Sequence, residues 1–337
     1  MKKNIILMVA GILLIFFLYV AVELLIPLPF GNRAVEFEIK KGTTFRQVVE
    51  GLSKKRMVRD KWVFLLLGRI TGIDRKIKAG YYPLWGSMSP FEIFDAFRLG
   101  SIIEYEITIV PGDSLREIAE KFSSLGIIEG PEFLRLSTDR DFLDIFNIDA
   151  PSLEGYLFPD TYRFPKGLEV KEVLSMMIAN LREKYDAGMQ ARTLELGLTE
   201  RDVLTMASII EKEAVTDSER PIIAAVYYNR LKKNMPLQAD PTAIYGIKSH
   251  KERITKQDLM RKTPYNTYVI KGLPPGPIAS PGLKSIKAAL YPAEVSYLYF
   301  VSNNDGTHNF SVTLNEHAGA VKAYRNKKKD AASQGAS

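Results

Sequence analysis

Cysteine is absent from all 337 residues of the chain, and histidine occurs only three times. Without cysteine there is no disulfide, no thiolate metal ligand and no cysteine nucleophile. The three histidines, His250, His308 and His317, lack the short spacing of zinc motifs such as His-Glu-x-x-His. We therefore expect no metal site and no cofactor.

Other signatures of common enzyme classes are missing as well. The chain has no P-loop and no dinucleotide fingerprint, and Ser208 lacks the Gly-x-Ser-x-Gly elbow of serine hydrolases. The formal net charge of +7 fits anionic partners, but the basic residues are spread along the chain. Charge alone is a weak argument, and we expect no nucleic-acid partner.

Charged side chains are lacking throughout residues 4–22, after two lysines near the N-terminus. A helix over this run would be roughly 29 Å long, which matches the hydrocarbon core of a bilayer. The run is long for a cleavable signal and no small-x-small site follows it, so we predict an uncleaved transmembrane anchor over residues 5–26. A signal peptide and a buried core helix are the alternatives. The lysines predict a cytoplasmic stub, residues 1–4, with Pro27 onward outside the cell membrane.

Two segments repeat at an offset of 70 residues, namely residues 37–58 and 107–128. Thr44 aligns with Ser114, and each copy predicts a short strand, a glycine turn and a capped amphipathic helix. The pattern resembles the LysM module, a small βααβ fold that often binds N-acetylglucosamine polymers. We assign residues 35–149 to this LysM-like region. A duplicated spacer without a sugar groove is the alternative.

The composition of the sequence changes near residue 150. Residues 151–167 are rich in aromatics, proline and glycine and predict an ordered loop, and long helical patterns follow. We predict a mainly helical catalytic domain with a small β-sheet over residues 150–325, and a disordered tail over 326–337. The fold class of the whole chain is α+β.

An apolar helix in this domain ends with acidic residues in the stretch ASIIEKEA, residues 207–214. At 100° per residue Glu211 and Glu213 lie on the two shoulders of the apolar face, and Lys212 points away to water. A carboxyl group against an apolar wall has a raised pKa and suits general acid catalysis. The alternative is a surface carboxylate paired with Lys212 or Arg220. The pattern does not separate the two glutamates.

Four motifs in order resemble the YceG-like family: EGYLFPDTYRF, ASIIEKEA, VYYNRLKKNMPLQADPTAIYG and TPYNTYVIKGLPPGPIASPG. The resemblance covers almost the whole chain. It implies a membrane-anchored lytic transglycosylase, a lyase that cuts nascent peptidoglycan strands between N-acetylmuramic acid and N-acetylglucosamine. Implied partners are the glycan strands and the peptidoglycan synthases of the membrane.

The resemblance also implies a single catalytic glutamate in the SIIEKE motif, which we carry to Glu211, with Glu213 as the alternative. It would protonate the glycosidic oxygen and then accept the proton of the muramic acid C6 hydroxyl. That hydroxyl closes a 1,6-anhydro ring, so no second carboxylate is needed as nucleophile or base. A non-catalytic peptidoglycan-binding scaffold is the competing function.

Further motif residues carry groups that suit a sugar cleft. Hydroxyl, amide and carboxylate groups can bind sugar hydroxyls, and tyrosine rings can cover sugar faces. Each residue could instead cap a helix or bridge loops. The expected substrate-binding residues are Tyr156, Tyr162, Gln238, Asp240, Thr242, Tyr265, Asn266 and Tyr268.

Overall fold

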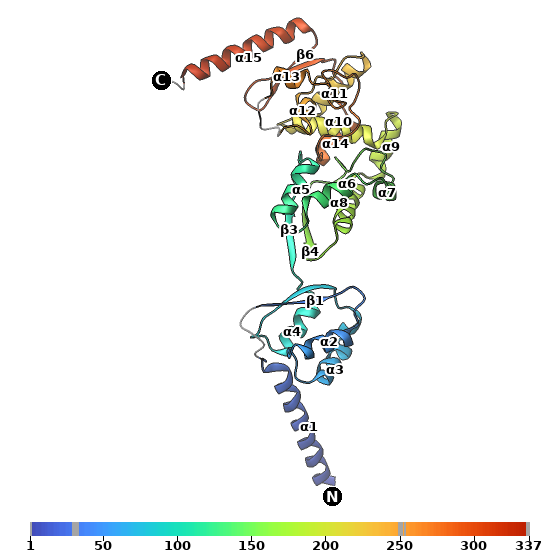
Figure 1. Ribbon diagram of the computed structural model, residues 1–337, viewed down its shortest axis with the longest axis vertical. Coiled ribbons are helices and arrows are strands. Elements are labelled where there is room, and N and C mark those ends of the chain that lie inside the picture. The colour runs from blue at the N-terminus through green and yellow to red at the C-terminus, as the bar shows by residue number, and fades with distance from the viewer. Residues whose placement is uncertain (1, 29–33, 249–251, 253, 335–337) are drawn as a thin grey trace. The chain divides into compact units, whose positions relative to one another are not determined.

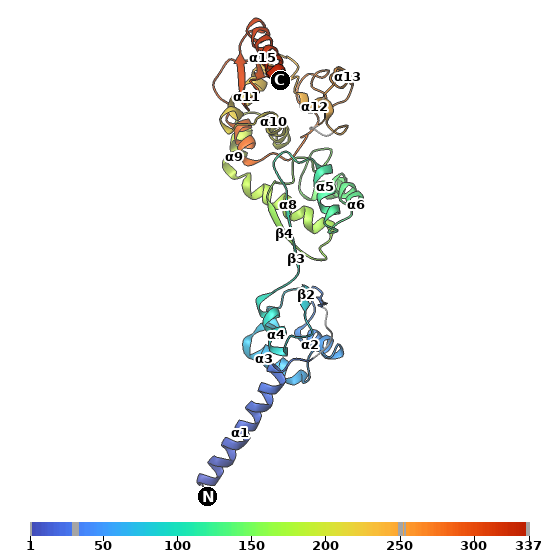
Figure 2. The same ribbon diagram turned by 90° about the vertical axis from the view of Figure 1, so that its left-hand side faces the viewer.

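The computed structural model describes residues 2–28, 34–248, 252 and 254–334, and its ribbon is drawn in Figures 1 and 2. The chain divides into two compact units. Unit 1 contains residues 1–106 and 163–168, and unit 2 contains residues 107–162 and 169–337. Helices predominate in the described residues, and the strands form two-stranded sheets. This agrees with the predicted α+β class.

Helix α1 (Lys2–Leu25) is the long apolar helix of unit 1 (Figure 1). Its mean hydropathy reaches 3.1 over an 18-residue window, and none of that window is buried. Exposure of the whole window argues against a core helix, and length and composition fit a single-pass anchor. Met1, the first residue of the predicted stub, lies outside the described residues, as do residues 29–33 after the helix.

The rest of unit 1 packs around a core of aromatic rings. The Phe64 ring lies 6.1 Å from the Phe45 ring and 5.5 Å from the Phe94 ring, measured between centroids. A Cβ on Gly68 would lie 2.1 Å from the Phe45 ring, so glycine permits this close approach. The elements are β1 (Val35–Ile39), α2 (Phe45–Lys54), α3 (Lys61–Thr71), a 3₁₀ turn η1 (Ile73–Arg75), β2 (Gly80–Leu84), which is antiparallel to β1, and α4 (Pro90–Leu99).

The second copy of the repeat has the same order of elements. Thr44 and Ser114 form capping boxes at α2 and α5, and the preceding Gly42 and Gly112 have φ of +84° and +91°. The local duplication is therefore present in the structure, whereas kinship with LysM remains a prediction. The elements are β3 (Glu104–Thr108), α5 (Leu115–Ser124), α6 (Gly130–Ser137), α7 (Arg140–Ile145) and β4 (Thr161–Pro165), which pairs with β3 (Figure 2).

The predicted domain boundary between residues 149 and 150 stays a prediction. The division into compact units lies elsewhere along the chain. It falls within β3 and β4, so the helices of the second copy belong to unit 2 together with the region expected to be catalytic. One contact that joins them is the backbone hydrogen bond from Ser280 N–H to the Asp113 carbonyl, at 2.8 Å.

Unit 2 is built around α10 (Glu200–Glu213), whose residues 203–210 are all buried. Thr199 and Asp202 form the predicted capping box at its start, and α11 and α14 pack against it. The other elements are α8 (Val170–Lys184), α9 (Ala187–Glu195), α10 (Glu200–Glu213), η2 (Asp217–Glu219), α11 (Arg220–Lys232), α12 (Asp240–Ile244), α13 (Lys256–Leu259), α14 (Leu283–Leu290), the antiparallel strands β5 (Tyr299–Ser302) and β6 (His308–Ser311), and α15 (Leu314–Gln334).

Disorder of the tail, residues 326–337, stays a prediction. Residues 326–334 belong to α15 in the structure, and residues 335–337 lie outside the described part. The small sheet expected near the end of the chain is the pair β5 and β6, with Phe300 opposite Phe310.

Candidate active site

Glu211 is held in a buried ion pair. Its Oε1 lies 3.0 Å from the Arg220 guanidinium, and its Oε2 accepts a hydrogen bond from the Gly282 backbone N–H at 2.9 Å. The two side chains are 7% and 11% exposed. The pairing with Arg220 that the sequence offered as an alternative is thus present. Both carboxylate oxygens already have donors, which suits a structural role.

Glu213, two residues later, is surrounded by other groups than Glu211. Its nearest donors are the Tyr227 hydroxyl at 3.3 Å and the backbone N–H of Asp240. Burial, and secondly the negative charge of Asp240, raise the pKa of Glu213 to about 7. The residue as a whole keeps partial exposure to solvent. A carboxyl group that is protonated near neutral pH can act as a general acid.

The loop before α12 brings more of the predicted residues to Glu213. Asp240 is exposed and accepts a hydrogen bond from the Tyr268 hydroxyl at 2.5 Å. The negative charges of Asp240 and Glu213, after burial, contribute to raising the pKa of Tyr268, so the three groups are neighbours. Gln238 lies two residues before Asp240 and has the left-handed φ of +53°.

Arg230 on α11 fixes this loop from the protein interior. Its guanidinium donates to the Pro236 carbonyl at 2.9 Å, to the Leu298 carbonyl at 3.1 Å and to Oε1 of Gln238. The same group lies 5.5 Å from the centroid of the Tyr299 ring. Arg230 is 7% exposed and so does not face solvent. It positions the loop from inside the protein.

Thr242 and Asn266 have internal roles in the structure. The buried Thr242 hydroxyl lies 2.8 Å from the Thr267 hydroxyl and donates to the Ala239 carbonyl. The buried Asn266 amide donates to carbonyls at the end of α13, including that of Arg261 at 2.7 Å. These contacts join the two loops that carry Asp240 and Tyr268.

The predicted tyrosines divide into two groups. Tyr156 and Tyr162 are buried, and the Tyr162 hydroxyl donates to the Phe158 carbonyl at 2.6 Å, so both serve the core. Tyr265 is half-buried beside Tyr245, with ring centroids 4.6 Å apart. Tyr245 in turn belongs to the wall of a pocket.

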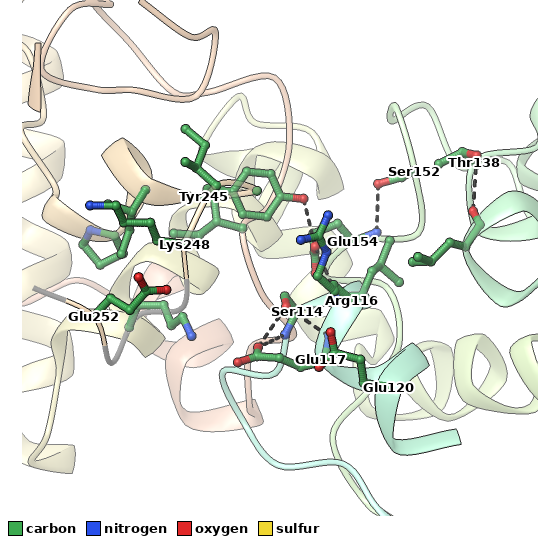
Figure 3. Close-up of a pocket in the computed structure, with 18 residues that line it drawn as sticks. Ser114, Arg116, Glu117, Glu120, Thr138, Ser152, Glu154, Tyr245, Lys248 and Glu252 are labelled. Carbon is green, nitrogen blue, oxygen red and sulfur yellow. Dashed lines mark hydrogen bonds between the residues drawn. The ribbon is translucent and has the colours of Figure 1, made fainter. Parts of the chain in front are cut away.

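This pocket, drawn in Figure 3, has a volume of about 560 Å³ and lies within unit 2. It is bounded by the start of α5 on one side and by the chain after α12 on the other. Pro241, next to Asp240, and Lys212, next to Glu213, also line it. The lining thus includes the sequence neighbours of Glu213 and Asp240, but not these two residues themselves.

Glu154 is the buried acid of this pocket, and sequence reasoning missed it. It accepts hydrogen bonds from the Leu115 N–H at 3.0 Å and from the Tyr245 hydroxyl at 2.8 Å, which points toward it in Figure 3. Burial raises its pKa to about 7. The only signal in the sequence was an acid inside the apolar and aromatic stretch LEGYLF.

Lys212 does not point to water as the helical angle predicted. Its ammonium group donates to the Gly112 carbonyl at 2.8 Å, and burial lowers its pKa. The chain before α5 packs over this side of α10, which a single helix pattern does not reveal.

Comparison with known proteins agrees with the motifs in this site. A family model described as the YceG-like family matches residues 37–323. The chain belongs to the YceG-like family. The match includes α10, the loop before α12 and the pocket, so the clusters around Glu211, Glu213 and Glu154 all lie within the family region.

Curated relatives carry a functional name. A Bacillus subtilis (strain 168) protein named endolytic murein transglycosylase is 33% identical over 316 residues, which are 88% of this chain and 86% of that protein. A Streptococcus pneumoniae (serotype 2, strain D39) protein of the same name is 27% identical over 329 residues. The match covers 88% of this chain and 59% of that longer relative.

A crystal structure of a YceG-like protein from Listeria monocytogenes is similar in fold. The TM-score is 0.59 at 31% sequence identity, and the match covers 86% of this chain and 99% of the Listeria chain. At this identity the likeness extends to the sequence as well as the fold of this YceG-like protein.

Proposed function

We propose that this protein is a membrane-anchored endolytic murein transglycosylase, a lyase that cuts within peptidoglycan glycan strands. The relatives from Bacillus and Streptococcus bear that name, and family membership extends over the whole candidate site. The observation that carries the proposal is the partly accessible Glu213, whose pKa is raised to about 7 at the end of α10.

Glu213 is the better general acid of the two glutamates in the motif. Glu211 is bound to Arg220 and to the Gly282 N–H, and protonating it would break a buried ion pair. Among the described residues, no cation is one of the groups that shift the pKa of Glu213, and Asp240 disfavours its charged form. We therefore assign the acid and base roles to Glu213 and a positioning role to Glu211.

The reaction balances with Glu213 alone. Its carboxyl proton passes to the glycosidic oxygen as the bond between that oxygen and C1 of N-acetylmuramic acid breaks. The C6 hydroxyl of the same sugar attacks C1 and gives its proton to the Glu213 carboxylate, which restores the acid. The products are a 1,6-anhydro end and a new N-acetylglucosamine end, and water does not enter. An intramolecular hydroxyl has a high effective molarity, which makes a second carboxylate unnecessary.

The polar groups around Glu213 suit the sugars on either side of the cut. Asp240 and Gln238 are exposed and can hydrogen-bond sugar hydroxyl and acetamido groups, and Tyr268 offers a half-buried ring. The pocket of Figure 3, whose lining includes Lys212 and Pro241, can hold a neighbouring part of the strand. The LysM-like copies are candidates for a further glycan contact.

The apolar helix α1 would hold the enzyme at the membrane where new strands are made. The lysines near the N-terminus favour a cytoplasmic N-terminus and an extracytoplasmic site. Peptidoglycan synthases in the same membrane are the proposed partners, because their product is the substrate.

The competing function is a glycan-binding scaffold without catalysis. Mass spectrometry of purified peptidoglycan digested by the detergent-solubilised full chain separates the two. The proposal expects anhydro-ended fragments from the parent and none from Glu213→Gln. The folded fraction of Glu211→Gln, the matched control, retains measurable cleavage.

Other outcomes would change the assignment. Reducing ends in place of anhydro ends would mean a hydrolase with a second carboxylate. Anhydro ends from Glu213→Gln, together with none from a folded Glu211→Gln, would return the role to Glu211. Glycan binding without cleavage by the parent would favour the scaffold.

A further inference from the structure

The outer face of α3 carries three large apolar side chains that are exposed. Trp62, Leu66 and Ile70 are 70%, 50% and 74% exposed, and their spacing of four places them on one side of the helix. We call this set the α3 stripe. The opposite side of α3 carries Phe64 and Gly68, which are buried in the aromatic core of unit 1. Isolated exposed apolar residues are ordinary, but a continuous row on one helix marks a contact surface.

The α3 stripe begins beside the end of the anchor helix. Asp60 caps α3 and accepts a hydrogen bond from the Tyr19 hydroxyl at 2.6 Å. Arg59 donates to the carbonyls of Ile26 at 2.8 Å and of Pro27 at 3.2 Å. Two consecutive residues therefore tie the start of α3 to the last turns of α1. A spanning helix leaves the hydrocarbon core at such a point.

The composition of α3 suits the boundary between lipid head groups and acyl chains. Tryptophan favours that boundary because its ring is apolar and its N–H is polar. Lys61 and Arg69 are exposed on the same helix and can meet anionic head groups. Trp62 and Ile70 are about 12 Å apart along the helix axis, so a helix lying in the interface can present the whole stripe to lipid.

We propose that the α3 stripe inserts into the surface of the same bilayer that α1 spans, with anionic phospholipid as its partner. The inference rests on the proposed anchoring by α1. A single spanning helix is free to tilt in the bilayer, together with the part of unit 1 that Arg59 and Asp60 tie to it. A second contact through α3 removes that freedom and fixes the tilt of unit 1 on the membrane.

The two tryptophans of the chain allow a direct test. The full chain carrying Trp85→Phe retains Trp62 alone as its tryptophan and is reconstituted into vesicles of phosphatidylglycerol and phosphatidylethanolamine. We expect Trp62 emission to move to shorter wavelength relative to detergent solution. We also expect quenching by lipids brominated near the head group and protection from aqueous iodide.

Two companion variants make the result interpretable. Phe16→Trp, in a chain with both natural tryptophans changed to phenylalanine, reports the anchor and should be quenched by lipids brominated deep in the acyl chain. Leu66→Gln with Ile70→Gln, added to Trp85→Phe, changes only exposed side chains and should leave the fold intact. This variant should float with the vesicles but lose most of the Trp62 quenching.

The outcomes separate the stripe from the anchor. One outcome is that lipid quenches the Phe16→Trp variant while iodide quenches Trp62 in the Trp85→Phe chain. This would overturn the α3 contact but not the anchor. Failure of the protein to float with vesicles would overturn both. Protection of Trp62 that grows with protein density, without quenching by lipid, would mean that a second copy covers the stripe, and this also overturns the proposal.

Discussion

Glu211 and Glu213 are two positions apart on α10 and meet opposite electrostatic environments. Successive helical residues rotate by about 100°, so side chains two apart project to nearly opposite sides. One side meets Arg220 and a backbone N–H, and the other meets Tyr227 and the charge of Asp240. Under the proposed function, the same residue type has a structural role at position 211 and a chemical role at position 213.

The first prediction concerns the pH dependence of cleavage. A general acid must be protonated when the substrate arrives, and the pKa of Glu213 is about 7. We expect kcat/KM for release of anhydro fragments to fall as pH rises above about 7. Asp240→Asn removes a negative charge that raises this pKa, so the alkaline limb should move to lower pH. The measurement is the pH profile of both proteins on the same peptidoglycan.

Asparagine is close in size to aspartate. The shift of the alkaline limb can therefore be measured separately from any loss of rate. A lower rate with an unmoved limb would mean that Asp240 contacts substrate without tuning Glu213. The control is Asp217→Asn, which removes an exposed carboxylate beside Arg220 and should leave the limb in place.

The second prediction separates the glutamates by stability. Glu211→Gln leaves Arg220 without its buried partner, and loss of one member of such a pair costs about 3 kcal/mol. Glu213→Gln replaces a desolvated acid by a neutral group and should keep or raise the Tm at pH 8. Thermal unfolding of both variants at pH 8 checks this. Equal losses of Tm would contradict the division of roles.

At the residue scale, the sequence predicted the glutamate motif but not the residues that surround it. The angular pattern placed both glutamates on shoulders of α10, as the structure has them. The sequence offered Arg220 as a surface partner, but it could not foresee that the chain turns after residue 214 and that the pair with Glu211 is buried. It also could not foresee that the segment before α5 covers Lys212. Both contacts join residues that are remote in the helical pattern.

At the scale of elements, hydrogen bonds of buried hydroxyl groups hold the loop before α12 against the loop after α13. The Thr267 hydroxyl accepts a hydrogen bond from the Ala239 N–H at 3.0 Å and lies against the Thr242 hydroxyl. Thr267→Val leaves the buried N–H unpaired, which costs roughly 1–3 kcal/mol. Because Asp240 follows Ala239, we also expect kcat to fall at saturating substrate.

Denaturant unfolding and steady-state cleavage measure these two effects. The matched control is Thr71→Val, at an exposed threonine whose hydroxyl donates to the Leu67 and Gly68 carbonyls of its own helix. Thr71→Val should change neither quantity by a comparable amount. A Thr267→Val protein with unchanged stability would show that the hydroxyl contacts do not fix the loops.

The elements also show why part of the site was foreseeable. Capping residues and turn glycines act locally, and the sequence therefore predicted α2, α5 and the start of α10. Asn266 and Thr242 were expected at the sugar but bond to carbonyls inside the fold, because a polar residue in a motif can serve either purpose. Only long-range contacts distinguish the two uses.

At the scale of the whole molecule, the carboxyl groups of the buried Glu154 and the half-buried Glu213 link folding to pH. The pKa values of Glu154 and Glu213 rise from 4.5 to about 7, mainly through burial. The folded protein therefore binds more protons than the unfolded chain between pH 4.5 and 7. The free energy of unfolding should fall as pH rises through that window and level off above pH 7.

Glu154→Gln tests this linkage where burial is strongest, since Glu154 is 3% exposed. An amide oxygen at the place of Oε2 can still accept from Leu115 N–H and the Tyr245 hydroxyl, while the ionisation is removed. For a shift from 4.5 to about 7 the stabilisation relative to the parent at pH 8 should be on the order of 3 kcal/mol. Urea unfolding from pH 4.5 to 8 should show a flatter curve for this variant. Glu120→Gln, at an exposed carboxyl of the same pocket, should keep the parent's slope, and an equal flattening there would show that burial of Glu154 is not the cause.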